Sequence, residues 1–378
     1  MDMRHPDNIL IYRLGSLGDT VVALPCFHLI RRTYPHARIT LLTNQPVSAK
    51  ASLATSILDH SGLCDDSIGY PVGTRSFSQL ASIRHSIGQL RPRLLINLAA
   101  TRGLLSSLRD YLFFRSCGIP EIVGTPFRQQ DLSIPRLEDG RYESEAHRLT
   151  SRLASLGAVN LENRELWSLH LNREERDQAK ALLPLNDRPL LAVSLGTKLE
   201  VNNWGDQNWK QLLAMLAREM PTAGLVLLGS TDEWDRCEEL SRVWSGACVN
   251  LCGRTSPRIS AAVLEGCGLI IGHDSGPMHL AGAAGIPTLG LFSWYNPPGQ
   301  WFPGHRNWKF IRALYPRLPA GGWQPQLRMK HTESEGIQLL KPERVCRSAL
   351  VLWKTFDSKS VVRPGQFAGG SLPQNLPS

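Results

Sequence analysis

Short apolar runs alternate with longer stretches of mixed polarity along most of this chain. In the first half, the runs lie at residues 9–12, 38–42, 94–98 and 121–123, and each predicts a buried strand. Helical stretches separate these runs, which is the rhythm of a parallel sheet covered by helices on both faces. The first half is therefore predicted to form one α/β unit.

The same rhythm restarts after a polar, proline-containing stretch at residues 162–189, where we place the domain junction. The predicted fold class is α/β, with a Rossmann-like, doubly wound parallel sheet in residues 1–175 and another in residues 176–355, facing a shared cleft. Residues 356–378 are predicted to be a disordered tail. In the second half we expect strands at 190–195, 225–228, 249–251, 269–271 and 286–292, and helices at 209–220, 257–265 and 341–353.

Length and composition agree with two soluble domains. A chain of 378 residues is too long for one ordinary core, and its 42% hydrophobic and 20% charged content are typical of a soluble globular protein. No apolar run reaches the roughly 18 residues that a membrane span requires, and the polar residues 1–8 predict no signal peptide. Eight cysteines without a CxxC pair favour a reducing cytoplasm and predict no structural metal.

The net charge of +9 is concentrated near the end of the chain. Residues 305–363 carry 12 Lys and Arg against 4 Asp and Glu, which leaves +8 in that segment. Such a block favours an acidic partner, such as a phosphorylated lipid or an anionic membrane surface. The alternative is a solvated face followed by a loose tail. Nothing in the chain resembles a nucleic-acid-binding module, so nucleic acid is not a predicted partner.

The stretch from residue 269 to 287 has the chemistry to hold a phosphate. A strand at 269–271 ends at a polar turn, residues 273–276, and Pro277 and Gly285 mark the start and end of a helix. A turn at the carboxyl end of a strand is the usual place for a ligand in an open α/β sheet. The backbone N–H groups of this helix start favour an anion.

Individual residues of this turn support that interpretation. Gly276 lets a diphosphate approach the backbone closely, and His279, about one turn into the helix, is placed to donate to a phosphate oxygen. Asp274 is too acidic to face phosphate and is expected on a ribose hydroxyl, a backbone N–H or a cation. The alternative is structural: Asp274 or Ser275 caps the helix and His279 is a buried histidine with its own partner.

A second glycine-rich turn, residues 13–20, follows the first strand and precedes a helix predicted at 21–32. It has neither the GKS/T of a P-loop nor the spacing of a dinucleotide fingerprint. Asp19 is interpreted either as a helix N-cap or as a carboxylate base at the sheet edge. Arg102, after the strand at 94–98, lies on the same predicted edge. It either meets an anionic group there or is an ordinary surface arginine.

These residues carry a family resemblance. Through Arg13-Leu14-Gly15-Ser16-Leu17-Gly18-Asp19 and Asp274-Ser275-Gly276-Pro277-Met278-His279-Leu280-Ala281, the chain resembles glycosyltransferase family 9, the heptosyltransferase family of lipopolysaccharide inner-core synthesis. The resemblance spans roughly residues 9–352. Weaker support comes from residues 95–103, from Trp204 with Trp209, and from residues 251–255 and 341–345.

The resemblance implies a GT-B fold and an inverting, metal-independent transfer without a cofactor. It implies ADP-heptose as donor and an anionic glycolipid of the inner core as acceptor, used by a cytoplasmic enzyme working at the inner face of the inner membrane. Asp19 matches the family's general base. The residues matching nucleotide-sugar contacts are Thr197 (phosphate), Glu233 (ribose), Thr255 (near the base), Asp274, Ser275, Gly276 and His279, and the expected acceptor contacts are Gly18 and Arg102.

The chain departs from the family pattern at one position. Many relatives have a lysine two residues before the tryptophan at Trp204, whereas this chain has Asn202. Lys198 is the nearest substitute for a cation that stabilises the leaving diphosphate, unless it only faces solvent. Two alternatives therefore stay open: a family 9 enzyme with another donor or acceptor, and a nucleotide-binding protein without transfer activity in which Asp19 is only a cap.

Overall fold

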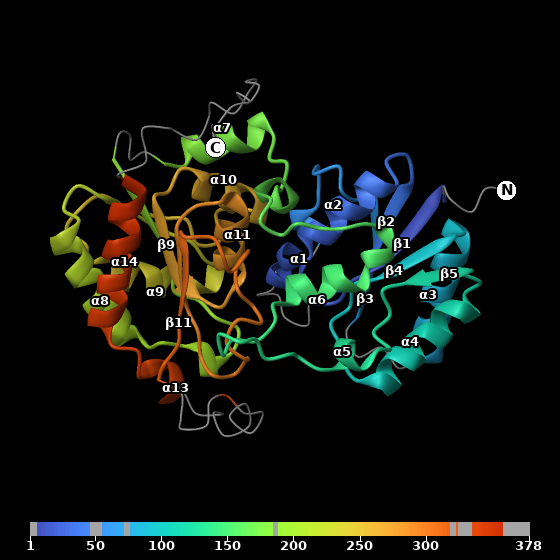
Figure 1. Ribbon diagram of the computed structural model, residues 1–378. Helices are drawn as coiled ribbons and strands as arrows, with labels where there is room; N and C mark the ends of the chain where they lie inside the picture. The colour runs from blue at the N-terminus through green and yellow to red at the C-terminus, as the bar shows by residue number, and fades with distance from the viewer. Residues whose placement is uncertain are drawn as a thin grey trace, which may run out of the picture.

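The computed structural model describes residues 6–45, 55–71, 76–183, 188–317, 323 and 335–357. Two separate sheets, each made of parallel strands and flanked by helices, lie side by side in one molecule (Figure 1). The chain crosses from the first sheet to the second between residues 123 and 190. The exact domain limits at residues 175 and 355 stay a prediction.

The N-terminal sheet has the strand order β3-β2-β1-β4-β5. Its central strand β1 is almost wholly buried, as expected of a parallel strand with helices on both faces. Its edge strand β3 was not predicted, because four of its six residues are exposed, none is fully buried, and its apolar signal is weak. The elements are β1 (Asn8–Tyr12), α1 (Leu17–Val22), α2 (Leu24–Thr33), β2 (Arg38–Gln45), β3 (Asp66–Pro71), α3 (Phe77–Leu90), β4 (Leu94–Asn97), α4 (Leu104–Ser116), β5 (Glu121–Val123), α5 (Gln129–Leu132) and α6 (Glu145–Arg152).

The C-terminal sheet has the order β11-β10-β9-β6-β7-β8. Its central strands β6 and β9 are buried along their whole length, whereas the unpredicted edge strand β11 lies within the basic segment. The elements are α7 (Arg173–Ala181), β6 (Leu190–Ser194), α8 (Asp206–Glu219), β7 (Gly224–Leu227), α9 (Trp234–Ser241), β8 (Cys248–Asn250), α10 (Pro257–Glu265), β9 (Leu269–His273), α11 (Gly276–Ala284), β10 (Thr288–Leu291), β11 (Ile311–Leu314), α13 (Glu335–Gln338) and α14 (Pro342–Asp357).

Of the two helices predicted after the glycine-containing turns, the first is corrected and the second is confirmed. The helix predicted at residues 21–32 begins earlier, at Leu17, and divides at Ala23 into α1 and α2. Pro25, in the first turn of α2, has no N–H to continue the hydrogen-bond ladder of α1, which explains the break. The helix after the phosphate-type turn is confirmed: Gly285 caps the end of α11 with φ +74°.

The predicted tail from residue 356 lies almost wholly outside the described residues, since α14 ends at Asp357 and the description stops there. Much of the basic segment at 305–363 is also outside them. No helix in the described ranges is long and apolar enough to cross a membrane.

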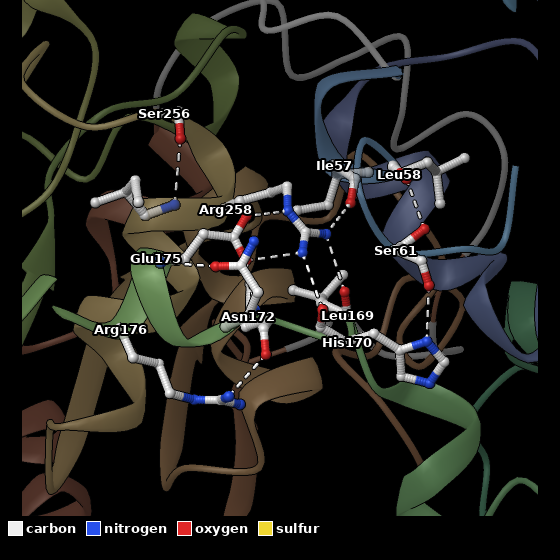
Figure 2. A network of polar contacts seen from close by, with 12 residues as sticks. Ile57, Leu58, Ser61, Leu169, His170, Asn172, Glu175, Arg176, Ser256 and Arg258 are labelled. Atoms are coloured by element: carbon white, nitrogen blue, oxygen red, sulfur yellow. Dashed lines mark hydrogen bonds and ion pairs between the residues drawn. The ribbon is translucent and has the colours of Figure 1, made fainter. Parts of the chain in front are cut away.

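The two halves are joined by a buried arginine (Figure 2). Arg258 of α10 donates from Nη1 to the carbonyl oxygen of Ile57 in the N-terminal half, at 3.0 Å, and to that of Leu169 in the connecting segment, at 2.9 Å. Its Nη2 donates to His170 O at 3.2 Å. Both nitrogens of its other edge, Nε and Nη2, pair with the Glu175 carboxylate on α7. All three segments are thereby held to one side chain.

Candidate functional site

The candidate site lies where the strand order of each sheet reverses. In the N-terminal sheet the chain builds outward from β1 to β3 and then returns to β4 on the other side of β1. The C-terminal sheet repeats this pattern with β6 and β9. Connections leave such a switch point in opposite directions and open a crevice at the carboxyl ends of the strands, where ligands bind in this fold class. Both predicted turns begin at these strand ends.

The starts of α1 and α11 meet across the two halves. A Cβ atom on Gly18 would lie 2.8 Å from Cδ2 of His279, and one on Gly276 would lie 2.6 Å from Cδ2 of Leu17. Only residues without a side chain allow the two helix starts to approach this closely. The structure therefore brings the Asp19 turn and the Ser275 turn together, from opposite halves of the molecule.

Asp19 occupies the third position of α1 and is not its N-cap. Ser16 is the N-cap, and its backbone N–H and its hydroxyl donate to Asp19 Oδ2 at 2.7 and 3.0 Å. Oδ1 accepts no hydrogen bond from any residue that the structure describes. Gly15, at φ +128°, makes room for this carboxylate, because a Cβ there would lie 2.4 Å from Asp19 Cγ. One oxygen is thus held and the other remains available.

Arg13 was not among the predicted site residues, although it directly follows the first strand. It is fully buried and donates from Nη1 to the carbonyl oxygen of Leu98, beyond β4, and from Nη2 to Asp19 O at 2.6 Å. Its Nη2 also lies 3.9 Å from Asp19 Oδ1. Arg13 therefore ties the start of α1 to the switch point of the sheet and faces the Asp19 carboxylate with a positive charge.

At the start of α11, two buried polar atoms have no partner within the described residues. They are the hydroxyl oxygen of Ser275, which is the N-cap, and Nδ1 of His279. His279 Nε2 lies 3.4 Å from Asp274 Oδ1, and Asp274 Oδ2 accepts from Asn296 Nδ2 at 3.4 Å. Buried polar atoms are almost always satisfied in folded proteins. An acceptor bound at this helix start would satisfy the Ser275 hydroxyl and a protonated His279 Nδ1, together with the backbone N–H groups of the first turn.

Lys198 lies close enough to Asp19 for the two charges to interact. Partial burial lowers the pKa of the Lys198 ammonium, and the Asp19 carboxylate acts in the opposite direction. Its neighbour Thr197 accepts the backbone N–H of Leu199 at 3.4 Å. Asn202, where the family resemblance leads us to expect a lysine, is buried and accepts a hydrogen bond from the Ser293 hydroxyl. Position 202 therefore faces the interior in this chain, while Lys198 is exposed and lies within electrostatic range of Asp19.

His273 was expected in the polar turn but is the last residue of β9 and is fully buried. Its Nε2 accepts the backbone N–H of Trp204 at 3.1 Å, and its Nδ1 lies 3.4 Å from Gly196 O. Burial lowers the pKa of this imidazole to about 4, so the ring is neutral near pH 7. It positions the loop after β6, which carries Thr197 and Lys198. The sequence signal that could have identified His273 as a buried strand residue is its position two residues after the apolar run 269–271.

The remaining predicted residues are spread along the strand ends. The Glu233 carboxylate lies against the ends of β6 and β7, since a Cβ on Gly196 or Gly229 would come within 1.6 or 2.1 Å of its oxygens. Thr255 Oγ1 lies 2.8 Å from Ser260 Oγ, within its own turn. In the ranges described, no cluster of three or more His, Cys, Asp or Glu side chains could hold a metal ion.

Arg102 is committed to its own half. Its Nη2 pairs with Asp110 Oδ2 on α4 and donates to the hydroxyl of Tyr12 at 3.3 Å. Asp110 also pairs with Arg109. Arg102 thus lies at the carboxyl edge of the sheet, as predicted. Its recorded contacts are with Asp110 and Tyr12 and not with Asp19.

Comparison of the sequence with known families matches residues 141–321 to "Glycosyltransferase family 9 (heptosyltransferase)". This range includes every predicted nucleotide-sugar contact, whereas Asp19 lies outside it. A similar protein is the lipopolysaccharide core heptosyltransferase OpsX of Haemophilus influenzae, 21% identical over 131 residues, which are 35% of this chain and 38% of the relative. Lipooligosaccharide heptosyltransferase 2 of the same organism is 26% identical over 123 residues, 30% and 35% of the two chains. The matched segments thus span little more than a third of these curated relatives.

Solved structures resemble the chain over nearly its whole length. A family 9 glycosyltransferase from Veillonella parvula superposes with a TM-score of 0.69 at 18% identity, covering 94% of this chain and 98% of that one. E. coli ADP-heptose lps heptosyltransferase II gives 0.61 at 18% identity, with 93% and 99% covered. E. coli heptosyltransferase WaaC with ADP-2-deoxy-2-fluoro heptose gives 0.59 at 15% identity, with 93% and 99% covered. The predicted GT-B fold is thereby confirmed.

Proposed function

Because the chain belongs to glycosyltransferase family 9, we propose that it transfers heptose from ADP-heptose to an anionic glycolipid of the lipopolysaccharide inner core, with inversion and without a metal ion. The observation that carries this proposal is the meeting of two helix starts. One presents a carboxylate with an available oxygen, and the other presents two buried, unpartnered polar atoms. A base and an anion cradle on opposite walls are what an inverting displacement requires.

In this proposal Asp19 is the general base. Its Oδ1 takes the proton from an acceptor hydroxyl as the hydroxyl oxygen forms a bond to the anomeric carbon of the donor. The bond from that carbon to the diphosphate oxygen breaks, and the electron pair leaves with the nucleoside diphosphate. Ser16 orients the carboxylate by holding Oδ2, and the Arg13 guanidinium lies 3.9 Å from Oδ1. Gly18 and Arg102 are proposed to contact the acceptor.

The start of α11 is proposed to hold the diphosphate. Its backbone N–H groups and the Ser275 hydroxyl would donate to the oxygens on which negative charge grows. His279 Nδ1 would donate as well when the ring carries a proton on both nitrogens, because Nε2 faces Asp274. Gly276 allows the close approach, and Lys198 supplies the cation that relatives carry at position 202. Asp274 is proposed to orient His279 through its 3.4 Å contact with Nε2. The other proposed nucleotide-sugar contacts are Thr197 (phosphate), Glu233 (ribose) and Thr255 (near the base).

One observation favours the alternative of a nucleotide-binding protein without transfer activity. The hydrogen bonds from Ser16 give Asp19 a complete structural role in the capping box of α1. A family 9 enzyme with a different nucleotide-sugar or acceptor is the other alternative, since the structures that show the fold are at most 18% identical.

The test begins with calorimetric binding of ADP, GDP, UDP and their sugars, followed by release of nucleoside diphosphate in the presence of candidate acceptors. We expect preference for the adenine nucleotide. The Asp19→Asn variant keeps an oxygen that accepts the Ser16 N–H, so α1 should stay capped. Its kcat should fall by about 10³-fold, the usual scale for loss of a general base, with unchanged donor affinity.

The matched control is Asp177→Asn, which removes an exposed carboxylate on α7 outside the candidate site and should keep full activity. Undiminished turnover in Asp19→Asn would exclude Asp19 as the base. Binding of adenine nucleotides without turnover for any acceptor tested would favour the binding protein.

A further inference from the structure

Helix α4 presents its leucines to solvent. Leu105 is 84% exposed, and Leu104, Leu108 and Leu112 are between 44% and 57% exposed. At about 100° per residue, these four positions fall within an arc of about 100° on one face. The face that packs on the protein is formed by Ser107, Asp110 and Phe114. A surface helix normally points its apolar stripe at the core, and α4 does the opposite.

The apolar surface continues beyond the helix. Phe127, in the loop before α5, is 41% exposed, and its ring lies edge-to-face against Tyr111 of α4 with centroids 5.5 Å apart. Figure 1 shows α4 and α5 at the lower edge of the N-terminal half, clear of the C-terminal half. We call Leu104, Leu105, Leu108, Leu112 and Phe127 the α4 patch. A contiguous exposed apolar patch of this kind marks an interaction surface.

Positive charge surrounds the α4 patch. Residues 77–128 contain seven arginines, no lysine and two carboxylates, Asp110 and Glu121. Asp110 is buried and neutralised by Arg102 and Arg109, so it presents no negative charge beside the leucines. The side chain of Arg109 is 66% exposed, and Arg115, in the last turn of α4, is exposed as well. Arg128 is 60% exposed but is paired with Asp131. The local surface is therefore apolar at its centre and cationic at its border.

We propose that the α4 patch docks on an anionic phospholipid surface. The leucines and Phe127 would enter the boundary between headgroups and acyl chains, and the bordering arginines would meet lipid phosphates, as in interfacial amphipathic helices. A second copy of the chain is a poorer occupant, because it would bring the arginines of two like-charged borders together.

The position of α4 makes this docking useful to the candidate site. The helix begins directly after residues 98–103, which leave the carboxyl end of β4. Within that loop the carbonyl oxygen of Leu98 accepts from Arg13, which in turn holds Asp19. A lipid surface on α4 would therefore adjoin the Asp19 side of the candidate site. The docking itself goes beyond the proposed function and does not require transfer activity.

The test is co-sedimentation of the full chain with vesicles, in the absence of donor and acceptor. Wild-type protein should bind vesicles of phosphatidylglycerol mixed with phosphatidylcholine. It should bind vesicles of phosphatidylcholine alone much more weakly. Leu105→Ser, Leu108→Ser and Leu112→Ser combined should lower the partition coefficient by about tenfold or more. Arg109→Gln with Arg115→Gln should weaken binding several-fold at low salt and change it little at high salt.

The matched control is Leu339→Ser with Val351→Ser, which removes exposed apolar side chains of the C-terminal half and should leave partitioning unchanged. Thermal unfolding and nucleotide affinity of the leucine variant should equal those of wild type, because the replaced side chains are exposed.

Three results would overturn the proposal. If wild-type protein does not bind anionic vesicles, the chain has no such lipid-binding surface. If the leucine variant binds as well as wild type, the lipid-binding surface is not the α4 patch. A dimer by light scattering that the leucine variant abolishes would identify a second copy as the occupant. These binding results can be interpreted even if no transfer activity is found, so the two proposals are tested separately.

Discussion

Two of the regions where the halves of the molecule meet treat polar groups in opposite ways. At the Arg258 junction, five hydrogen bonds occupy Nε, Nη1 and Nη2 of one side chain. Where α1 meets α11, contact is made through Gly18 and Gly276, and the buried Ser275 hydroxyl and His279 Nδ1 have no partner among the residues described.

This difference separates a structural contact from a candidate binding site. A buried polar group without a partner lowers stability by about 1–3 kcal/mol, so a fold rarely keeps one without a use. The chain satisfies Arg258 completely with its own carbonyl and carboxylate oxygens, so that junction holds the halves together. At α11 it leaves the donors open beside a helix start, where an anion supplies the missing acceptors.

Breaking the Arg258 junction should have the largest effect on stability. Arg258→Ala leaves the buried Glu175 carboxylate without its cation. Burial opposes ionisation of Glu175, but the hydrogen bonds from Arg258 and Asn172 outweigh it and keep its pKa below the ordinary value. We expect the free energy of unfolding in urea to fall by about 4 kcal/mol.

Arg176→Ala is the matched control, because it removes a partly exposed ion pair with Glu265 on the same two helices. It should lower the free energy of unfolding by less than about 1 kcal/mol. Equal losses in the two variants would show that the junction contributes no more than a surface ion pair.

Lowering the pH should reduce the stability of the folded protein, because His273 is buried as a neutral ring. Its pKa is about 4 in the folded protein and near 6.5 in an unfolded chain. The unfolded state therefore binds more protons between these values, and stability falls as the pH drops from about 6.5 to 4. The expected loss is about 3 kcal/mol. His273→Gln should flatten this part of the pH profile, whereas His36→Gln, at an exposed position, should not.

Removing the Lys198 cation near Asp19 should slow transfer without unfolding the protein. Lys198→Ala should lower kcat by about 10²-fold, the usual scale for one group that stabilises a transition state. Lys210→Ala, at an exposed position of α8, is the control and should keep the wild-type kcat. An unchanged kcat in Lys198→Ala would assign leaving-group stabilisation to α11 alone.

Adding a methyl group between the helix starts should have the smallest effect. In Gly276→Ala the new Cβ would overlap Leu17, so α1 and α11 must separate slightly, and we expect nucleotide affinity to fall by about tenfold. Gly88→Ala in α3 is the control, because a Cβ there meets no atom within 4 Å. Its nucleotide affinity should equal that of wild type, and calorimetry measures both variants.

Much of the local structure was predictable from the sequence. The strand at residues 121–123 and the helix at 257–265 have the predicted bounds, and Gly285 ends α11 as expected. The earlier start of α1 also had a local signal that went unused, since Ser16 and Asp19 have capping-box spacing. Edge strands β3 and β11 were missed because half-exposed strands of four to six residues lack a strong apolar pattern.

By itself the sequence determined the alternation of strands and helices and the two turns that carry candidate chemistry, because periodicity, caps and glycines act within a few residues. Only the tertiary structure decided which buried polar groups find partners. Arg13 bonds a residue 85 positions away, His273 one 69 away and Arg258 one 201 away. It also decided that α4 turns its leucines outward, because the face that a helix buries depends on the sheet beneath it.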